Sequence, residues 1–455
     1  MKKKILFYLL LLLSIFLVCC GKSAKELYPT DPAPDGGDIY YEPSPSISYE
    51  GMDGAIAGKT EGLPAYSDAA VPETEGDVDP DVVIPDDPKT EEPIMNNEPQ
   101  SGQLTASVVF DNDHYAFWKS LISKGQDETG LFYDYNSVYP FDTSYRFELH
   151  TGVAGLKVIM DGKYSGVTNA KGRVYLFPKK AESHTIDIYN GKNKVDSLTF
   201  DGNPEEITMT DIFFTMNGTS PIQLKEKIQI AFVIDTTGSM GDEINYLKSE
   251  LKSVINRVKG DLENIEIEIA LVFYRDYGDD YVTLVKDFTN DIDLQQEALK
   301  KQYADGGGDW EEAVQVAFKD TNKLSWDDEA KTKLVVFVAD APCHREDAQT
   351  VVDETNKFAE KGIRVITVAS SGIDKGTEFL FRSICLVTNG AYGYLTNDSG
   401  IGGYHVEATT EEKPVVEYLN AMLVRLIEGF HTGEFADAVP WRGVQIDEEG
   451  QNKKD

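Results

Sequence analysis

The sequence predicts an α/β fold, a doubly wound and mostly parallel sheet of six strands over residues 225–430. Apolar segments of strand length alternate with amphipathic helical segments through this whole region. The region is also long enough, at about 200 residues, to bury a large hydrophobic core. A small β-sandwich at 101–222 and a disordered segment at 21–100 are expected before it, and a tail at 431–455 after it.

The alternation sets the expected elements of the main domain. We expect strands near residues 228–234, 265–274, 281–287, 333–339, 363–369 and 391–395. We expect helices near residues 241–258, 292–304, 310–323, 345–361, 376–388 and 413–428. The second and third strands are joined by a short loop at Tyr277–Asp280, so the third should be an antiparallel edge strand.

The N-terminal 20 residues predict export. Three lysines precede the apolar run Ile5–Val18, which is too short for a comfortable membrane span and has the layout of a secretory signal. The run ends in Leu-Val-Cys-Cys-Gly, which resembles a bacterial lipoprotein box with Cys20 as the lipidated residue. Cys19 departs from the small residue preferred there, and it could itself be the lipidation site. An ordinary signal peptide or an N-terminal anchor helix would also be compatible with this segment.

The lipoprotein resemblance implies a protein of the bacterial cell envelope, lipid-anchored to the outer membrane or cell surface. Residues 22–100 suit a solvated tether from that membrane, because they hold 12 of the 19 prolines, 19 acidic residues and four lysines. Such a low-hydrophobicity, highly charged composition predicts disorder. The formal net charge of −35 and the absence of a basic patch argue against nucleic acid as a partner.

Residues 101–222 predict a small β-rich domain. Short apolar segments at 145–149, 155–160, 172–178, 184–190 and 194–200 are separated by glycine- and asparagine-containing turns, which is typical of a β-sandwich. A short helix is expected within Ala106–Lys124. The segment Val167–Val174 resembles carboxypeptidase-regulatory or Ig-like repeats of surface proteins, and we interpret the domain as a spacer without a ligand of its own.

Cysteine usage excludes a disulfide framework. Beyond the signal region only Cys343 and Cys385 remain, in segments expected to lie far apart, and no Cys/His spacing typical of a zinc site occurs. In the tail, the acidic residues after Gly433 are expected to be disordered, apart from Val439–Trp441, which could pack on the domain.

The segment Ile228–Met240 carries the strongest indication of chemistry. An apolar strand ends in Asp235, and the hydroxyls of Thr237 and Ser239 follow at alternate positions. Open α/β sheets place ligands at this edge, and hard oxygen donors suit Mg²⁺, Mn²⁺ or Ca²⁺. A strand followed by a polar helix cap would give a similar pattern without a metal.

This motif resembles the metal-ion-dependent adhesion site of the von Willebrand factor A (vWA) domain, whose pattern is Asp-x-Ser-x-Ser. Three further segments deliver carboxylates to the same edge. One strand ends at Asp276, another ends at Asp340, and the glycine-rich loop Gly306–Ala313 contains Asp309 and Glu312. The closer resemblance is to the integrin beta-chain I-like domain, whose loop carries Asp-x-Pro-Glu. Here Glu311 replaces the proline.

The resemblance implies a main site of Asp235, Thr237, Ser239, Glu312 and Asp340, holding Mg²⁺ or Mn²⁺. It also implies flanking sites, with Ca²⁺ as a candidate ion, one at Asp242 and Glu243 and another at Asp276 and Asp309. Acids in the first turn of a helix are favoured by the helix dipole in any case, so Asp242 and Glu243 have a second explanation. Asp276 could likewise belong to a polar loop with its aromatic and charged neighbours.

The function implied is metal-dependent protein binding of the adhesion type, in which a partner's Asp or Glu completes the coordination of the cation. An assembly or scaffold lipoprotein of the cell envelope is the main competing hypothesis. A hydrolase using Cys343 and His344 is a weaker one, because adjacent residues at a strand end rarely point at each other, and the resemblance assigns His344 to packing or loop orientation. We therefore expect a binding protein rather than an enzyme.

Overall fold

A computed structural model describes residues 99–125, 129–179, 183–201, 211–213, 220–262 and 264–442. The signal segment with Cys20, the linker up to residue 98 and the tail beyond residue 442 lie outside the described residues. Within the described ranges, no helix combines the length and the apolar character needed to cross a membrane.

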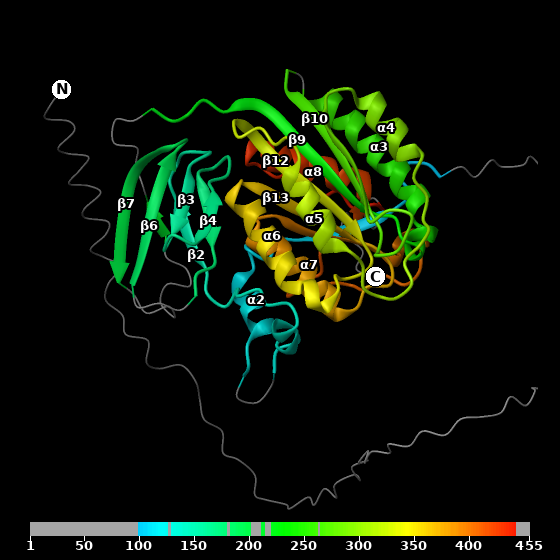
Figure 1. Cartoon of the computed structure of the whole chain (residues 1–455), viewed down its shortest axis with the longest axis horizontal. Coiled ribbons are helices and arrows are strands. Elements are labelled where there is room, and N and C mark those ends of the chain that lie inside the picture. The colour runs from blue at the N-terminus through cyan, green and yellow to red at the C-terminus, as the bar shows by residue number, and fades with distance from the viewer. Residues whose placement is uncertain are drawn as a thin grey trace, which may run out of the picture. The chain divides into compact units, whose positions relative to one another are not determined.

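One mostly parallel sheet dominates the described region (Figure 1). Its strands are β1 (Thr105–Val109), β9 (Lys225–Asp235), β10 (Glu266–Tyr274), β11 (Thr283–Thr289), β12 (Ala330–Ala339), β13 (Ile363–Ala369), β14 (Ala391–Leu395) and β15 (Glu417–Tyr418). They lie in the order β11-β10-β9-β12-β13-β14-β1-β15. The five strands from β10 to β14 in this order are parallel, and β11 and β1 pair antiparallel to their neighbours.

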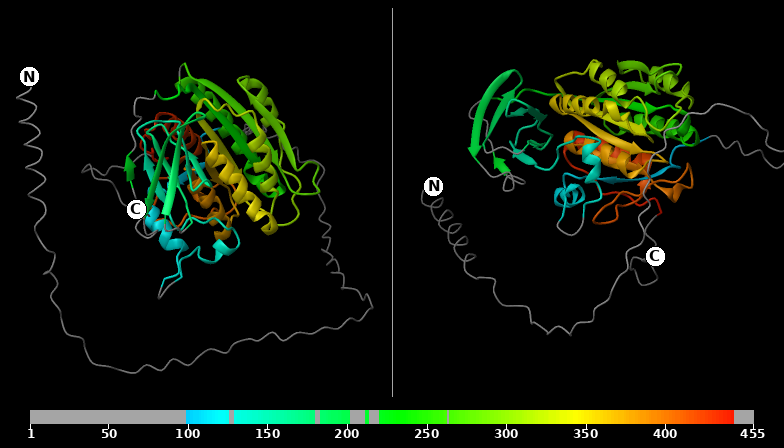
Figure 2. Two further views of the ribbon diagram at one scale, coloured as in Figure 1. Left: turned by 60° about the vertical axis from the view of Figure 1, so that its left-hand side comes forward. Right: turned by 60° about the horizontal axis from the view of Figure 1, so that its bottom comes forward.

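Helices cover both faces of this sheet, as the views in Figures 1 and 2 show. They are α2 (Tyr115–Ile122), α3 (Ile244–Asp261), α4 (Ile292–Lys300), α5 (Val314–Lys323), α6 (Ala348–Glu360), α7 (Lys375–Val387) and α8 (Leu419–Thr432). Alternate residues of β9 enter different cores: Val233 packs in the core that includes residues of α2, α5, α6 and α7, and Phe232 in the core that includes residues of α3, α4 and α8. This two-sided burial explains the uniformly apolar strands.

The sheet has eight strands where the sequence predicted six. The two additional strands are β1 and β15, which pair with each other and extend the sheet beyond β14. Residues 105–109 therefore belong to the main sheet, although the sequence placed them in the preceding domain; α2 (Tyr115–Ile122) lies within the range 106–124 where a short helix was expected. Glu250 fixes the segment directly before β1, because its buried carboxylate accepts hydrogen bonds from the N–H groups of Gly102, Gln103 and Leu104.

The described residues between 147 and 213 form two small sheets. Their strands are β2 (Phe147–His150), β3 (Lys157–Met160), β4 (Tyr164–Val167), β5 (Arg173–Leu176), β6 (Ser183–Asn190), β7 (Asn193–Asp201) and β8 (Asp211–Phe213). The strand orders are β5-β2-β8 and β4-β3-β6-β7. Buried side chains from both sheets, among them Leu149, Val158 and Ile188, form one shared apolar cluster.

Candidate metal centre

Asp235 stands at the carboxyl end of β9, with its side chain fully buried. Its Oδ1 accepts a hydrogen bond from the Thr237 backbone N–H at 2.9 Å and another from the Thr237 hydroxyl at 2.6 Å. The Thr237 hydroxyl also lies 3.2 Å from the hydroxyl of Ser239, which is exposed to solvent. The motif thus folds into a tight turn that gathers three oxygen-bearing side chains and opens to solvent at Ser239.

The loop between α4 and α5 brings Glu312 to the same place. The Glu312 N–H donates to the carbonyl of Pro342 at 2.9 Å, and Glu312 forms a β-bridge with Cys343, so the loop is attached to the segment that follows β12. Gly307 has a φ of 77°, and a Cβ there would lie 3.1 Å from the Glu312 Oε1 and 3.5 Å from the Thr237 Cβ. A glycine at this position lets the loop backbone pass close to both side chains.

Three carboxylate oxygens in this centre have no hydrogen-bond partner among the described residues. They are Oδ2 of Asp235, Oε2 of Glu312 and Oδ1 of Asp340, and all are buried. Leaving a buried charged acceptor unpaired is costly. The three oxygens come from three separate segments of the chain, and the donor set of carboxylates and hydroxyls is the one that Mg²⁺ and Mn²⁺ prefer. The residues present therefore fit a hard divalent cation.

The electrostatics of the centre support the same interpretation. Burial raises the pKa of Asp235 to about 6, of Asp340 to about 8 and of Glu312 to about 9. After burial, the charge of Asp235 is the largest contribution that raises the pKa of Glu312 and Asp340. Without a cation, the three carboxylates are thus both desolvated and mutually repulsive.

Glu243 is held by groups outside this centre. Its buried carboxylate accepts a hydrogen bond from the Ser371 N–H at 3.2 Å and lies 2.7 Å from the His405 Nε2. Asp242 is exposed, with its Oδ2 3.4 Å from the Ser371 hydroxyl. His405 could not be identified from sequence patterns, because it stands on an irregular loop 162 positions from Glu243.

We expect Glu243→Ala to destabilise the protein by about 1–3 kcal/mol, because it leaves the buried His405 and the Ser371 N–H without their acceptor. Urea unfolding should show the same loss in EDTA and in Mg²⁺. Glu407→Ala, on an exposed residue of the His405 loop, is the matched control and should change stability little. A loss that appears only in Mg²⁺ would instead identify Glu243 as a cation ligand.

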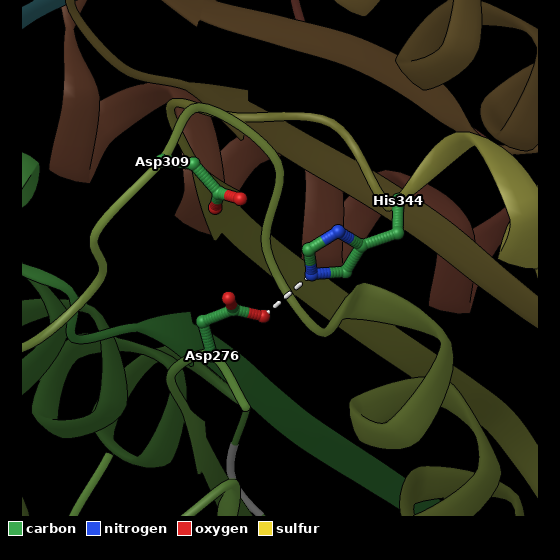
Figure 3. Close-up of side chains that lie close together, drawn as sticks. All are labelled: Asp276, Asp309 and His344. Carbon is green, nitrogen blue, oxygen red and sulfur yellow. Dashed lines mark hydrogen bonds and ion pairs between the residues drawn. The ribbon is translucent and has the colours of Figure 1, made fainter. Parts of the chain in front are cut away.

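The second pair of predicted flanking residues lies together with a histidine. Asp276 follows β10, and its Oδ1 is 2.6 Å from Nε2 of His344. Asp276, Asp309 and His344 each offer a ligand atom, and these atoms all lie within 4.8 Å of one another (Figure 3).

Cys343 is not part of either group. Its thiol is fully buried, and burial raises its pKa to about 12. The ring nitrogens of His344 lie near Asp276 and Glu311. The geometry therefore does not favour a thiolate nucleophile activated by His344.

A family model described as the von Willebrand factor A domain matches residues 229–400. Among curated proteins, the chain is 32% identical over 119 residues to the ariadne-like RING finger protein R811 of Acanthamoeba polyphaga mimivirus, covering 26% of this chain and 11% of that protein. It is 23% identical over 171 residues to the alpha-protein kinase vwkA of Dictyostelium discoideum, and this match covers 37% of this chain and 27% of that protein. The chain thus spans less than a third of the length of either relative.

Among solved structures, the chain is similar to the conserved hypothetical protein BatB from Bacteroides thetaiotaomicron. The match has 15% sequence identity and a TM-score of 0.29, and it covers 37% of this chain and 89% of that one.

Proposed function

We propose that the von Willebrand factor A domain at residues 229–400 binds a divalent cation, Mg²⁺ or Mn²⁺, and through it a carboxylate of a partner protein. The observation that carries the proposal is the set of three buried, unpartnered carboxylate oxygens of Asp235, Glu312 and Asp340. A vWA domain by itself suggests protein–protein interaction or adhesion, and the carboxylate set adds the chemistry by which the interaction would occur.

Each side chain of the centre has a distinct task in this proposal. Asp235 is oriented by its two hydrogen bonds from Thr237, which leave its Oδ2 free to face the cation. The hydroxyls of Thr237 and Ser239 add neutral donors, so they bind without cancelling more of the positive charge. Because Ser239 is exposed, a partner carboxylate can approach from that side. When bound, the cation would supply an electrophilic position that accepts this carboxylate.

The setting proposed is the bacterial cell envelope, with the chain anchored by lipid at Cys20 and the acidic segment after it as a tether. The support for this setting is the sequence of residues 1–100 alone. The partner protein that presents an Asp or Glu would then be located within the cell envelope or beyond the membrane that holds the lipid anchor.

Water proton relaxation with Mn²⁺ as the probe tests the binding mode. The full chain, with Mn²⁺ bound, should enhance relaxation through exchangeable water on the cation, and Asp235→Asn should remove the share due to the main site. A peptide carrying an accessible Asp should lower that share by displacing water, whereas the same peptide with Asn should not. If neither peptide changes the relaxation enhancement, the proposal that the cation accepts a partner carboxylate is contradicted.

A further inference from the structure

We propose that Asp276, Asp309 and His344 form a second metal site that prefers a divalent transition ion, such as Zn²⁺, over Mg²⁺ and Ca²⁺. This inference goes beyond the proposed function, because it requires neither the main cation nor a partner protein. The integrin-type resemblance assigned only the two aspartates to a flanking site and made no ligand of His344, so the structure changes both the composition of the site and the ion that it would take.

The three side chains come from three segments that converge at the carboxyl edge of the sheet. Asp276 follows β10, Asp309 belongs to the loop before α5, and His344 follows β12. Figure 3 shows the three side chains turned toward a common space. Ligand atoms around one ion at about 2.1 Å lie about 3–4 Å apart. The observed limit of 4.8 Å therefore needs only a small rotation, which the exposed Asp309 is free to make.

The imidazole determines the class of ion. Mg²⁺ and Ca²⁺ are hard cations that take oxygen ligands, whereas imidazole nitrogen suits first-row transition ions. Zinc accepts both imidazole nitrogen and carboxylate oxygen, and a zinc site with three protein ligands keeps a fourth position open. The five residues of the main centre include no histidine, so the two centres would differ in the ions that they select.

Neighbouring groups already hold the His344 ring in place. The Glu311 Oε2 lies 3.7 Å from the His344 Nδ1, the nitrogen that faces away from Asp276. At this distance Glu311 adds negative charge beside the ring without a hydrogen bond, and Nε2 itself lies 2.6 Å from Asp276 Oδ1, a contact that a bound cation would replace. Glu311 is also the residue that replaces the proline of the integrin-type pattern.

The aromatic ring of Tyr277 stacks on His344, with ring centroids 5.7 Å apart at an interplanar angle of 27°. Tyr277 is in turn fixed by a hydrogen bond of 2.9 Å from Gln315 to its hydroxyl. The ring of His344 is therefore oriented before any ion binds, which is the arrangement expected of a built site.

Co²⁺ absorption is the direct test, because Co²⁺ stands in for Zn²⁺ and reports its ligands through visible bands. The full chain, first treated with chelator, should develop these bands with one Co²⁺ per chain. Zn²⁺ should abolish them at equal concentration, and a large excess of Ca²⁺ or Mg²⁺ should not. His344→Ala should remove the bands.

Three further variants keep this test independent of folding and of the main centre. Asp309→Asn alters an exposed side chain and should also remove the bands, whereas Asp235→Asn should retain them. His114→Ala, on an exposed histidine outside the cluster, is the matched control and should bind Co²⁺ as the wild type does. The proposal is overturned if the wild type gives no bands or if the bands persist in His344→Ala and Asp309→Asn. It is also overturned if Ca²⁺ displaces Co²⁺ as effectively as Zn²⁺ does.

Discussion

Asp235→Asn is expected to abolish the stabilisation of the protein by Mg²⁺ while leaving the metal-free protein at least as stable as the wild type. The amide keeps the Oδ1 that accepts from Thr237, so the turn should survive. It removes the buried charge that, after burial itself, does most to raise the pKa of Glu312 and Asp340, which should favour the metal-free fold. The free energy of unfolding of the wild type should rise by about 2.7 kcal/mol at a Mg²⁺ concentration 100 times the dissociation constant. That of the variant should not rise.

Urea unfolding in EDTA and in Mg²⁺ measures both parts of this prediction. Asp353→Asn, on the exposed face of α6, is the matched control and should keep the full gain from Mg²⁺. A purely structural Asp235 would behave differently, because its loss would lower stability already in EDTA. That result, or an undiminished Mg²⁺ effect in Asp235→Asn, would count against the metal centre.

Glu312→Gln is expected to become more stable relative to the wild type as pH rises, provided that no cation is present. The native pKa of Glu312 is raised to about 9, above its ordinary value of 4.5. Between these values the native carboxyl keeps its proton after the unfolded chain has released it, so the wild type loses stability as pH increases. Each pKa unit corresponds to about 1.4 kcal/mol, and the difference should reach several kcal/mol by pH 9.

The comparison with the wild type isolates this effect from the many other carboxylates that titrate. Unfolding of both proteins in EDTA should be followed from pH 5 to pH 9, and again with saturating Mg²⁺. With saturating Mg²⁺ at neutral pH, the wild type should be more stable than Glu312→Gln, because the cation binds the ionised Glu312 of the wild type. A difference between the two proteins that does not vary with pH in EDTA would show that Glu312 is not held in a repulsive, desolvated cluster.

Much of the main sheet could be predicted from the sequence because its parallel strands are buried on both faces. Such strands form continuous apolar runs, and the predicted ranges 363–369 and 391–395 coincide with β13 and β14. Three of the candidate ligand acids could be predicted for a related reason. Asp235, Asp276 and Asp340 each stand at the end of an apolar strand or just after it, so topology alone brings them to one edge.

The strands β1 and β15 could not be predicted in this way. Residues 105–109 pair with β14, almost 290 positions away in the chain, and β15 has only two residues. Pairing with β1 also explains why the last helix begins at Leu419 rather than near residue 413, since Glu417 and Tyr418 adopt strand geometry. Long-range pairing of this kind leaves no local periodic signal.

The side chains that contact these acids could not be predicted from the sequence either. His344 was assigned to packing or loop orientation, and its contact with Asp276 depends on how two loops meet. The pairing of Glu243 with His405 depends on the course of a long irregular segment after β14. Sequence patterns locate residues on elements, whereas contacts between loops are decided by the packing of the whole domain.

Calorimetric titration of the chelated full chain with Mg²⁺, beside Asp235→Asn, measures cation binding at the main centre itself. We expect saturable binding of Mg²⁺ to the wild type and none to the variant at the main centre. Equal heats from the two proteins, or no binding to the wild type, would contradict a cation site at Asp235, and the domain at residues 229–400 would then be a scaffold that binds without a cation.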